Sequence, residues 1–206
     1  HQSLLHLATR NKAMLSLQLL LELGVNPNIG DKYEDTPLHI ASFMGNVEMV
    51  EMLLKYNADP NQANKRKETP LHKGSFKGEI GVIKLLLDNK ADIYLTDEFH
   101  ASVLQYAVRS KKIKAVKFLI EQGAIVNSLD FRNQSTLHYA ALYSTVDIVK
   151  YLIEIGVNPY SKTNYLLTPL HLAIEHPDFE MVAIFLNSGL TSYDESKYGF
   201  SPYDEA

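Results

Sequence analysis

The chain has 206 residues, a net charge of −4 and no cysteine. The absence of cysteine excludes disulfides, thiolate catalysis and cysteine-ligated metals, and the mildly acidic balance argues against a nucleic-acid partner. No run of 18 apolar residues occurs, so the sequence predicts no transmembrane helix.

A short motif returns along the chain every 33 residues. It reads Thr-Pro-Leu-His-x-Ala at 36–41 and again at 168–173, and its first four residues return at 69–72. The copies align without a gap and begin at Ser3, Thr36, Thr69, Ser102, Ser135, Thr168 and Ser201. The chain therefore divides into repeats 3–35, 36–68, 69–101, 102–134, 135–167 and 168–200, with a partial seventh at 201–206.

The second repeat illustrates what each repeat predicts. Thr36 is suited to cap a helix, and Pro37 then occupies the first helical position, where an N–H is not needed. This first helix is expected to end at Gly45-Asn46. A second helix is expected over 47–56, because its apolar residues recur at helical spacing. Asn57 follows as a residue able to adopt a left-handed conformation.

The other repeats follow this plan with local departures. The second helix of the first repeat is expected over 15–23, and that of the third over 80–89. Lys90 stands where a glycine is preferred, which predicts mild strain at a positive φ. The fourth repeat lacks both the proline and the histidine of the motif, the fifth keeps His138 without the proline, and the sixth has Pro177 between its helices.

The period and the Thr-Pro-Leu-His-x-Ala pattern are those of the ankyrin repeat, and the chain resembles an ankyrin repeat protein over almost its whole length. The resemblance implies an all-α repeat solenoid, in which helix-turn-helix units with short β-hairpin fingers stack as a single domain over 1–206. Both ends lie within a repeat and neither looks like the polar capping unit that a solenoid needs. We therefore expect the chain to be a fragment of a longer protein.

The eight histidines raise the question of a metal site or a catalytic site. Five share one repeat position: His6, His39, His72, His138 and His171. Stacked repeats would separate them by about 10 Å, too far for one ion, and the resemblance implies that they link neighbouring loops. The sequence also lacks a phosphate-binding loop, a dinucleotide-binding turn, a nucleophile elbow and the zinc motif His-Glu-x-x-His. We expect no cofactor, no metal and no enzymatic activity.

The resemblance places partner binding at positions that vary between repeats, on the finger tips and the first helices, which together form the concave face. The candidate residues are Tyr33, Phe43, Met44, Arg66, Phe76, Lys77, Phe99, Arg109, Phe131, Arg132, Leu142, Tyr143, Tyr165 and His176. The set is rich in aromatic residues and arginine, which are enriched at the centres of protein interfaces. The alternative is that the rings pack sideways against the next repeat.

Two basic clusters stand apart from the rest of the sequence. One is Lys65-Arg66-Lys67 at a finger tip, and the other is the fourth-repeat set Arg109, Lys111, Lys112, Lys114 and Lys117. They are either a solvated face or a docking patch for an acidic peptide or an anionic head group.

These observations predict a scaffold that binds a partner protein or peptide on its concave face. We expect a monomer in the cytoplasm, with the nucleus also compatible. One alternative is a targeting or regulatory arm of a larger enzyme, a bacterial effector among the options, whose catalytic domain lies outside these residues. A purely structural spacer is a second alternative, which the aromatic residues disfavour.

Overall fold

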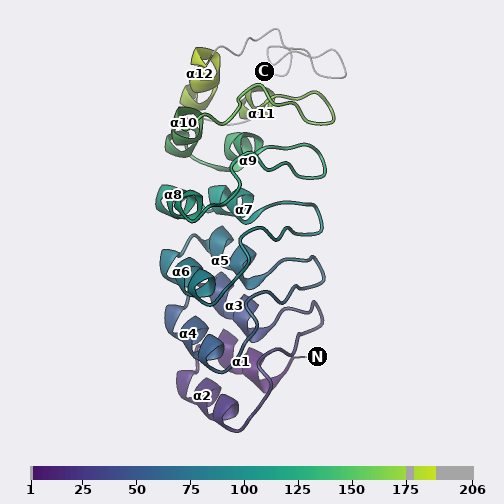
Figure 1. Cartoon of the computed structure of the whole chain (residues 1–206), viewed down its shortest axis with the longest axis vertical. Coiled ribbons are helices and arrows are strands. Elements are labelled where there is room, and N and C mark those ends of the chain that lie inside the picture. Colours follow the sequence, from purple (N-terminus) through teal and green to yellow (C-terminus); the bar gives the residue numbers. More distant parts are fainter. Residues whose placement is uncertain (1, 175–178, 189–206) are drawn as a thin grey trace. The chain divides into compact units, whose positions relative to one another are not determined.

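The computed structural model describes residues 2–174 and 179–188, and Figure 1 shows the course of the chain. The chain divides into two compact halves, His1–Glu98 and Phe99–Ala206. The helices of the N-terminal half are α1 (Leu4–Arg10), α2 (Met14–Glu22), α3 (Pro37–Met44), α4 (Val47–Lys55), α5 (Pro70–Lys77) and α6 (Ile80–Asp88). Those of the C-terminal half are α7 (Val103–Arg109), α8 (Ile113–Glu121), α9 (Thr136–Tyr143), α10 (Val146–Glu154), α11 (Pro169–Ala173) and α12 (Phe179–Asn187).

Each repeat contributes a pair of helices, and each half is built by packing successive pairs. In the N-terminal half α1, α3 and α5 pack in series, as do α2, α4 and α6. In the C-terminal half α7, α9 and α11 form one series, and α8, α10 and α12 the other. Within each half of Figure 1, the odd-numbered helices lie beside the fingers and the even-numbered helices lie on the side away from them.

The Ser or Thr that opens each motif starts an odd-numbered helix. At α3, the Thr36 N–H donates to Nδ1 of His39 at 3.1 Å, and the His39 N–H donates to the Thr36 hydroxyl at 3.4 Å. This reciprocal pattern is a capping box in which histidine takes the place of the usual glutamate. The motif therefore both starts the helix and orients the histidine ring.

Residues in the left-handed region end the helices where the sequence predicts. Gly45 ends α3 with a φ of 70°, and Asn57 follows α4 with a φ of 62°. Lys90 has a φ of 67° after α6, which confirms the positive φ predicted there. Ser144 differs: it ends α9 with a φ of −108°, in extended backbone.

The core of each half is a column of equivalent leucines between the helix pairs. The leucine of the motif is fully buried in five successive repeats, as Leu5, Leu38, Leu71, Leu104 and Leu137. Burying a leucine side chain contributes on the order of 2 kcal/mol. Because each repeat buries its leucine against its neighbours, the pattern of the motif becomes the pattern of the core.

A buried polar side chain braces each finger from within. Oδ1 of Asp31 accepts hydrogen bonds from the N–H groups of Tyr33 and Asp35, at 2.8 and 3.2 Å. The equivalent acceptors in later fingers are Asn64, Asp130 and Thr163. The fingers form no sheet among the described residues, although Leu129 and Ser135 make an isolated antiparallel bridge.

Candidate interaction surface

The predicted residues of the N-terminal half meet in a stack of two phenylalanines. Phe43 lies on α3 and Phe76 on α5, with ring centroids 6.1 Å apart and planes inclined by 12°. Phe43 is 52% exposed, whereas Phe76 is half-buried. The two rings therefore pack against each other between repeats, while Phe43 remains exposed; that they contact a partner stays a prediction.

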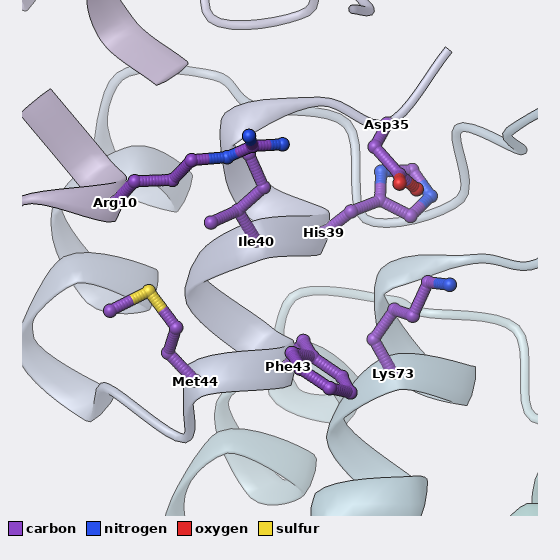
Figure 2. Close-up of a pocket in the computed structure, with 7 residues that line it drawn as sticks. All are labelled: Arg10, Asp35, His39, Ile40, Phe43, Met44 and Lys73. Atoms are coloured by element: carbon purple, nitrogen blue, oxygen red, sulfur yellow. The ribbon is translucent and has the colours of Figure 1, made fainter. Parts of the chain in front are cut away.

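Phe43 also lines an open pocket of about 400 Å³, which we call the Phe43 pocket. Figure 2 shows side chains from α1, α3 and α5 around it. The lining residues are Arg10, Asp35, His39, Ile40, Phe43, Met44 and Lys73. Of the predicted candidates, the pocket contains Phe43 and Met44.

Internal contacts hold the charged groups of the Phe43 pocket. Arg10 donates to the buried carboxylate of Asp31 at 3.2 Å, and Lys73 pairs with the buried carboxylate of Glu68. The Asp35 carboxylate accepts a hydrogen bond from the Asn64 amide at 2.7 Å. The pocket therefore offers a partner chiefly apolar surface, provided by Phe43, Ile40 and Met44.

The C-terminal half holds a second pocket of about 220 Å³, the Arg109 pocket. It is lined by Phe99, Arg109, Asp130, Phe131, Arg132, Gln134, Tyr139 and Tyr143. Five of these residues, Phe99, Arg109, Phe131, Arg132 and Tyr143, belong to the set predicted from the sequence. The structure thus brings residues from two fingers and two helices, α7 and α9, around one pocket.

The rings and guanidinium groups of the Arg109 pocket lie against one another. The Phe99 and Phe131 ring centroids are 5.3 Å apart, and the Arg132 guanidinium carbon lies 5.1 Å from the Phe131 centroid. The Arg109 guanidinium carbon lies 5.1 Å from the Tyr143 ring. Cation–π contacts of this kind fix the planar ends of the arginines.

The remaining candidates lie outside both pockets. Tyr33, Arg66 and Tyr165 are exposed at finger tips, Lys77 is exposed at the end of α5, and Leu142 is half-buried on α9. His176 lies outside the described residues. The two pockets are therefore lined by some of the predicted residues and not by others, and the contact of any of them with a partner stays a prediction.

Two groups of residues in this region were not among the sequence candidates. Ile40, Lys73 and Tyr139 share one repeat position, three residues before Phe43, Phe76 and Leu142 on the same helices. That separation is nearly one helical turn and places them on the same face, so the 33-residue alignment could have included them. The same alignment relates the buried finger acceptors Asp31, Asn64, Asp97, Asp130 and Thr163.

The motif histidines His6, His39 and His138 connect their repeats to the next finger, as the resemblance implies. Nε2 of His39 lies 2.9 Å from the carbonyl oxygen of Glu68, and Nε2 of His6 lies 2.8 Å from that of Asp35. Gln105 stands in for histidine in the fourth repeat, and its side-chain amide donates to the Gln134 carbonyl oxygen at 2.9 Å. Among residues 2–174 and 179–188, no group of three or more His, Asp or Glu side chains is placed to hold a metal ion.

Burial favours the neutral form of His39 and His138. It lowers the pKa of His39 below its usual value and lowers the pKa of His138 from 6.5 to about 4, although hydrogen bonds to the backbone carbonyls of Glu68 and Leu167 oppose the shifts. Because Nδ1 accepts a backbone N–H in both cases, the proton of the neutral ring resides on Nε2 and is donated to the carbonyl.

The basic clusters differ in how their side chains are used. In the first, Lys65 donates to the carbonyl oxygen of Lys32 at 2.8 Å, which ties one finger to the next. In the second, Lys117 lies 4.6 Å above the Tyr151 ring on the even-numbered helices, whereas Arg109 lines the pocket described above. Part of each cluster therefore contacts the protein itself, and the docking interpretation stays a prediction.

The sequence signature of ankyrin repeats in three copies matches residues 5–97, 81–163 and 104–196, and the chain therefore belongs to the ankyrin repeat family. The fold is similar to that of the human ASB11 ankyrin repeat domain, a crystal structure of 27% identity and TM-score 0.89, over all of this chain and 92% of that one. It is also similar to the ankyrin repeat domain of Bcl-3, a unique member of the IkappaB protein family. That domain is 22% identical, with a TM-score of 0.78, over all of this chain and 94% of that one. No curated protein sequence was found to match the chain.

Ankyrin repeat domains are in general protein–protein interaction modules, and domains of this fold are typically non-catalytic. No helix in the described part of the chain is long and apolar enough to cross a membrane.

Proposed function

We propose that the chain is a scaffold module that binds a partner protein or peptide, inside the cell, on the face that the odd-numbered helices and the finger tips form in each half. The observation that carries this proposal is the Arg109 pocket, which is lined by five of the residues predicted from the ankyrin resemblance and from their aromatic or arginine side chains. Residues that serve packing alone would not need to gather arginine and aromatic side chains around an open hollow.

The exposed rings supply a reason for association. Phe43 is 52% exposed and Phe131 is 49% exposed. Covering the exposed half of such a ring, about 100 Å², would contribute roughly 2–3 kcal/mol to binding. The paired rings of either half, Phe43 with Phe76 or Phe99 with Phe131, would act as hot spots of an interface once a partner covers them.

The fingers are held in place before any partner arrives. Buried side chains cap each turn internally, and the Lys65 N–H donates to the Tyr33 carbonyl oxygen at 3.0 Å, which links two adjacent tips. In the C-terminal half, the Phe131 N–H donates to the Phe99 carbonyl oxygen at 2.9 Å. A braced surface loses little conformational entropy on binding, which favours affinity.

A capture experiment with paired baits tests the proposal. Wild-type protein and the variant Phe43→Ser/Phe76→Ser would be immobilised and exposed to a cell lysate, and each retained protein would then be purified and titrated against both baits. We expect a partner whose affinity falls at least about tenfold in the variant, because two interface rings are lost.

A matched control removes exposed apolar side chains away from this face. Leu15 on α2 is 84% exposed and Tyr94, in the turn after α6, is 62% exposed. The variant Leu15→Ser/Tyr94→Ser should retain the partner, and circular dichroism should show that all three proteins are folded. Equal affinity of a folded Phe43→Ser/Phe76→Ser variant for every retained protein would contradict the proposed face.

A further inference from the structure

We propose that the Arg109 pocket binds a carboxylate side chain of an acidic peptide segment in the partner protein. The carboxylate would lie between the guanidinium groups of Arg109 and Arg132, and an apolar neighbour in the peptide would cover Phe99 and Phe131. This inference rests on the proposed function, because it names the chemistry of the partner that the face accepts.

Aromatic rings lie beside both arginines of the pocket. The Arg109 guanidinium carbon lies 5.1 Å from the Tyr143 ring and 5.9 Å from the Tyr106 ring. The Arg132 guanidinium carbon lies 5.1 Å from the Phe131 ring. The N–H donors of a guanidinium group lie in its plane. Those donors suit the two oxygens of a carboxylate.

The carboxylate in the pocket lining is already engaged by other groups. Oδ1 of Asp130 accepts the N–H groups of Arg132 and Gln134 at 2.9 and 2.7 Å. Its Oδ2 accepts the Tyr139 hydroxyl at 3.0 Å, and the residue is buried. Asp130 therefore braces the finger that carries Arg132, and its negative charge stays at the base of the pocket.

The balance of charge selects the occupant. Two arginines and one aspartate give the lining a net charge of +1, which matches one carboxylate. The fourth repeat, residues 102–134, holds six Lys or Arg and two Asp or Glu, a net charge of +4, whereas the half Phe99–Ala206 as a whole carries −2. The basic charge is therefore concentrated in the repeat that supplies Arg109 and Arg132, which favours an acidic segment at this place. An aromatic-lined pocket could otherwise suit a methylated lysine, but two guanidinium groups repel a cation.

A phage-displayed library of random linear peptides tests the inference. Selection on the wild-type protein should enrich peptides in which Asp or Glu adjoins an aromatic or aliphatic residue. For synthetic copies of these peptides, changing the acid to its amide should weaken binding at least about tenfold. Arg109→Gln/Arg132→Gln should weaken binding by a similar factor. Salt on the order of 0.5 M should also weaken binding of the peptides to the wild-type protein.

The control variant Lys112→Gln/Lys114→Gln removes the same charge next to and within α8 and should leave binding within about twofold, because exposed charges at a distance are screened by salt. Should Arg109→Gln disturb α7, Arg132→Gln alone keeps the test valid, since Arg132 is exposed and lies outside the helices. Circular dichroism would confirm that each variant is folded.

The outcomes separate this inference from the proposed function. Enriched peptides that are neutral or basic, or that bind the double arginine variant as tightly as wild type, would overturn the carboxylate site. If the Phe43→Ser/Phe76→Ser variant failed to bind such peptides, the proposed function as an interaction module would still be supported. Sedimentation with phosphatidylserine vesicles that depends on both arginines, without any peptide enrichment, would overturn both proposals in favour of a membrane surface.

Discussion

Nε2 of His138 lies 2.9 Å from the carbonyl oxygen of Leu167. Leu167 is at the end of the finger that connects the α9–α10 pair to α11. Nδ1 of the same ring accepts the Ser135 N–H at 3.1 Å at the start of α9. One buried side chain therefore caps a helix and holds the end of a finger 29 residues away. This double role makes the stability of the fold sensitive to the protonation of its histidines.

We predict that the protein loses stability in mild acid. The folded-state pKa of His138 is lowered to about 4 from 6.5, so the unfolded chain binds this proton first as the pH falls. Stability is complete above about pH 6.5, decreases from there to about pH 4, and has fallen by on the order of 3 kcal/mol from this residue alone. Urea unfolding at a series of pH values measures the loss, to which the buried His39 adds in the same direction.

A constant free energy of unfolding between about pH 7 and pH 4 would contradict this account. The ring can also be followed directly, since the His138 resonances should titrate near the lowered pKa of about 4. A normal titration near 6.5 would show that the ring is not buried in its neutral form.

We predict that His138→Gln preserves stability at neutral pH and weakens its acid dependence. The fourth repeat already uses this solution: the Ser102 N–H donates to Oε1 of Gln105 at 2.8 Å, and the Gln105 amide donates to the Gln134 carbonyl oxygen at 2.9 Å. Glutamine makes both links and does not titrate.

The matched variant His138→Ala loses both links and leaves a buried cavity, which should cost on the order of 3 kcal/mol. Urea unfolding near neutral pH should therefore place His138→Gln within about 1 kcal/mol of wild type and well above His138→Ala. Equal losses for the two variants would mean that the ring acts through its volume rather than its hydrogen bonds.

We predict that Asp130→Ala destabilises the finger, whereas Asp130→Asn is tolerated. Asp130 is buried and accepts two backbone N–H groups and the Tyr139 hydroxyl. Alanine leaves these donors without their acceptor, at a cost of roughly 1–3 kcal/mol. Asparagine keeps the Oδ1 acceptor, as Asn64 does in the second repeat.

Thermal unfolding of the two Asp130 variants checks the difference. Hydrogen exchange should show faster exchange at the N–H groups of Arg132 and Gln134 in Asp130→Ala, because both donate to the lost oxygen. Unchanged protection at these two groups would show that the finger is held from elsewhere.

The repeat period predicts most of this fold because each helix pair is specified locally. The capping residue, proline, leucine and histidine of the motif act within a few residues of one another, so Thr36 and His39 could be assigned before the structure was known. Lys90 was also recognised as a residue in a glycine position, from its place in the alignment alone.

The pockets were harder to predict because they depend on side-chain directions between repeats. Tyr139 completes the Arg109 pocket by its bond to Asp130, and no local pattern reveals that a tyrosine on α9 reaches the preceding finger. The sequence left open whether Phe43 and Phe76 contact a partner or pack sideways; in the structure they stack on each other, with Phe43 exposed and Phe76 half-buried. Such details follow from packing, which a period of 33 residues does not encode.

We predict that Lys90→Gly stabilises the protein. Lys90 follows α6 with a φ of 67°, while the equivalent residues Gly24, Gly123 and Gly156 adopt φ values of 79°, 92° and 87°. Glycine populates this region without the steric cost that a side chain incurs, so the change should raise the free energy of unfolding by roughly 0.5–1 kcal/mol. The gain exceeds the entropy that glycine adds to the unfolded chain, because native lysine is strained at this position.

Lys84→Gly, at an exposed position inside α6, is the control and should lower stability by about 1 kcal/mol. Urea unfolding of both variants decides the matter: a loss of stability in Lys90→Gly would show that the lysine side chain contributes contacts that outweigh its backbone strain.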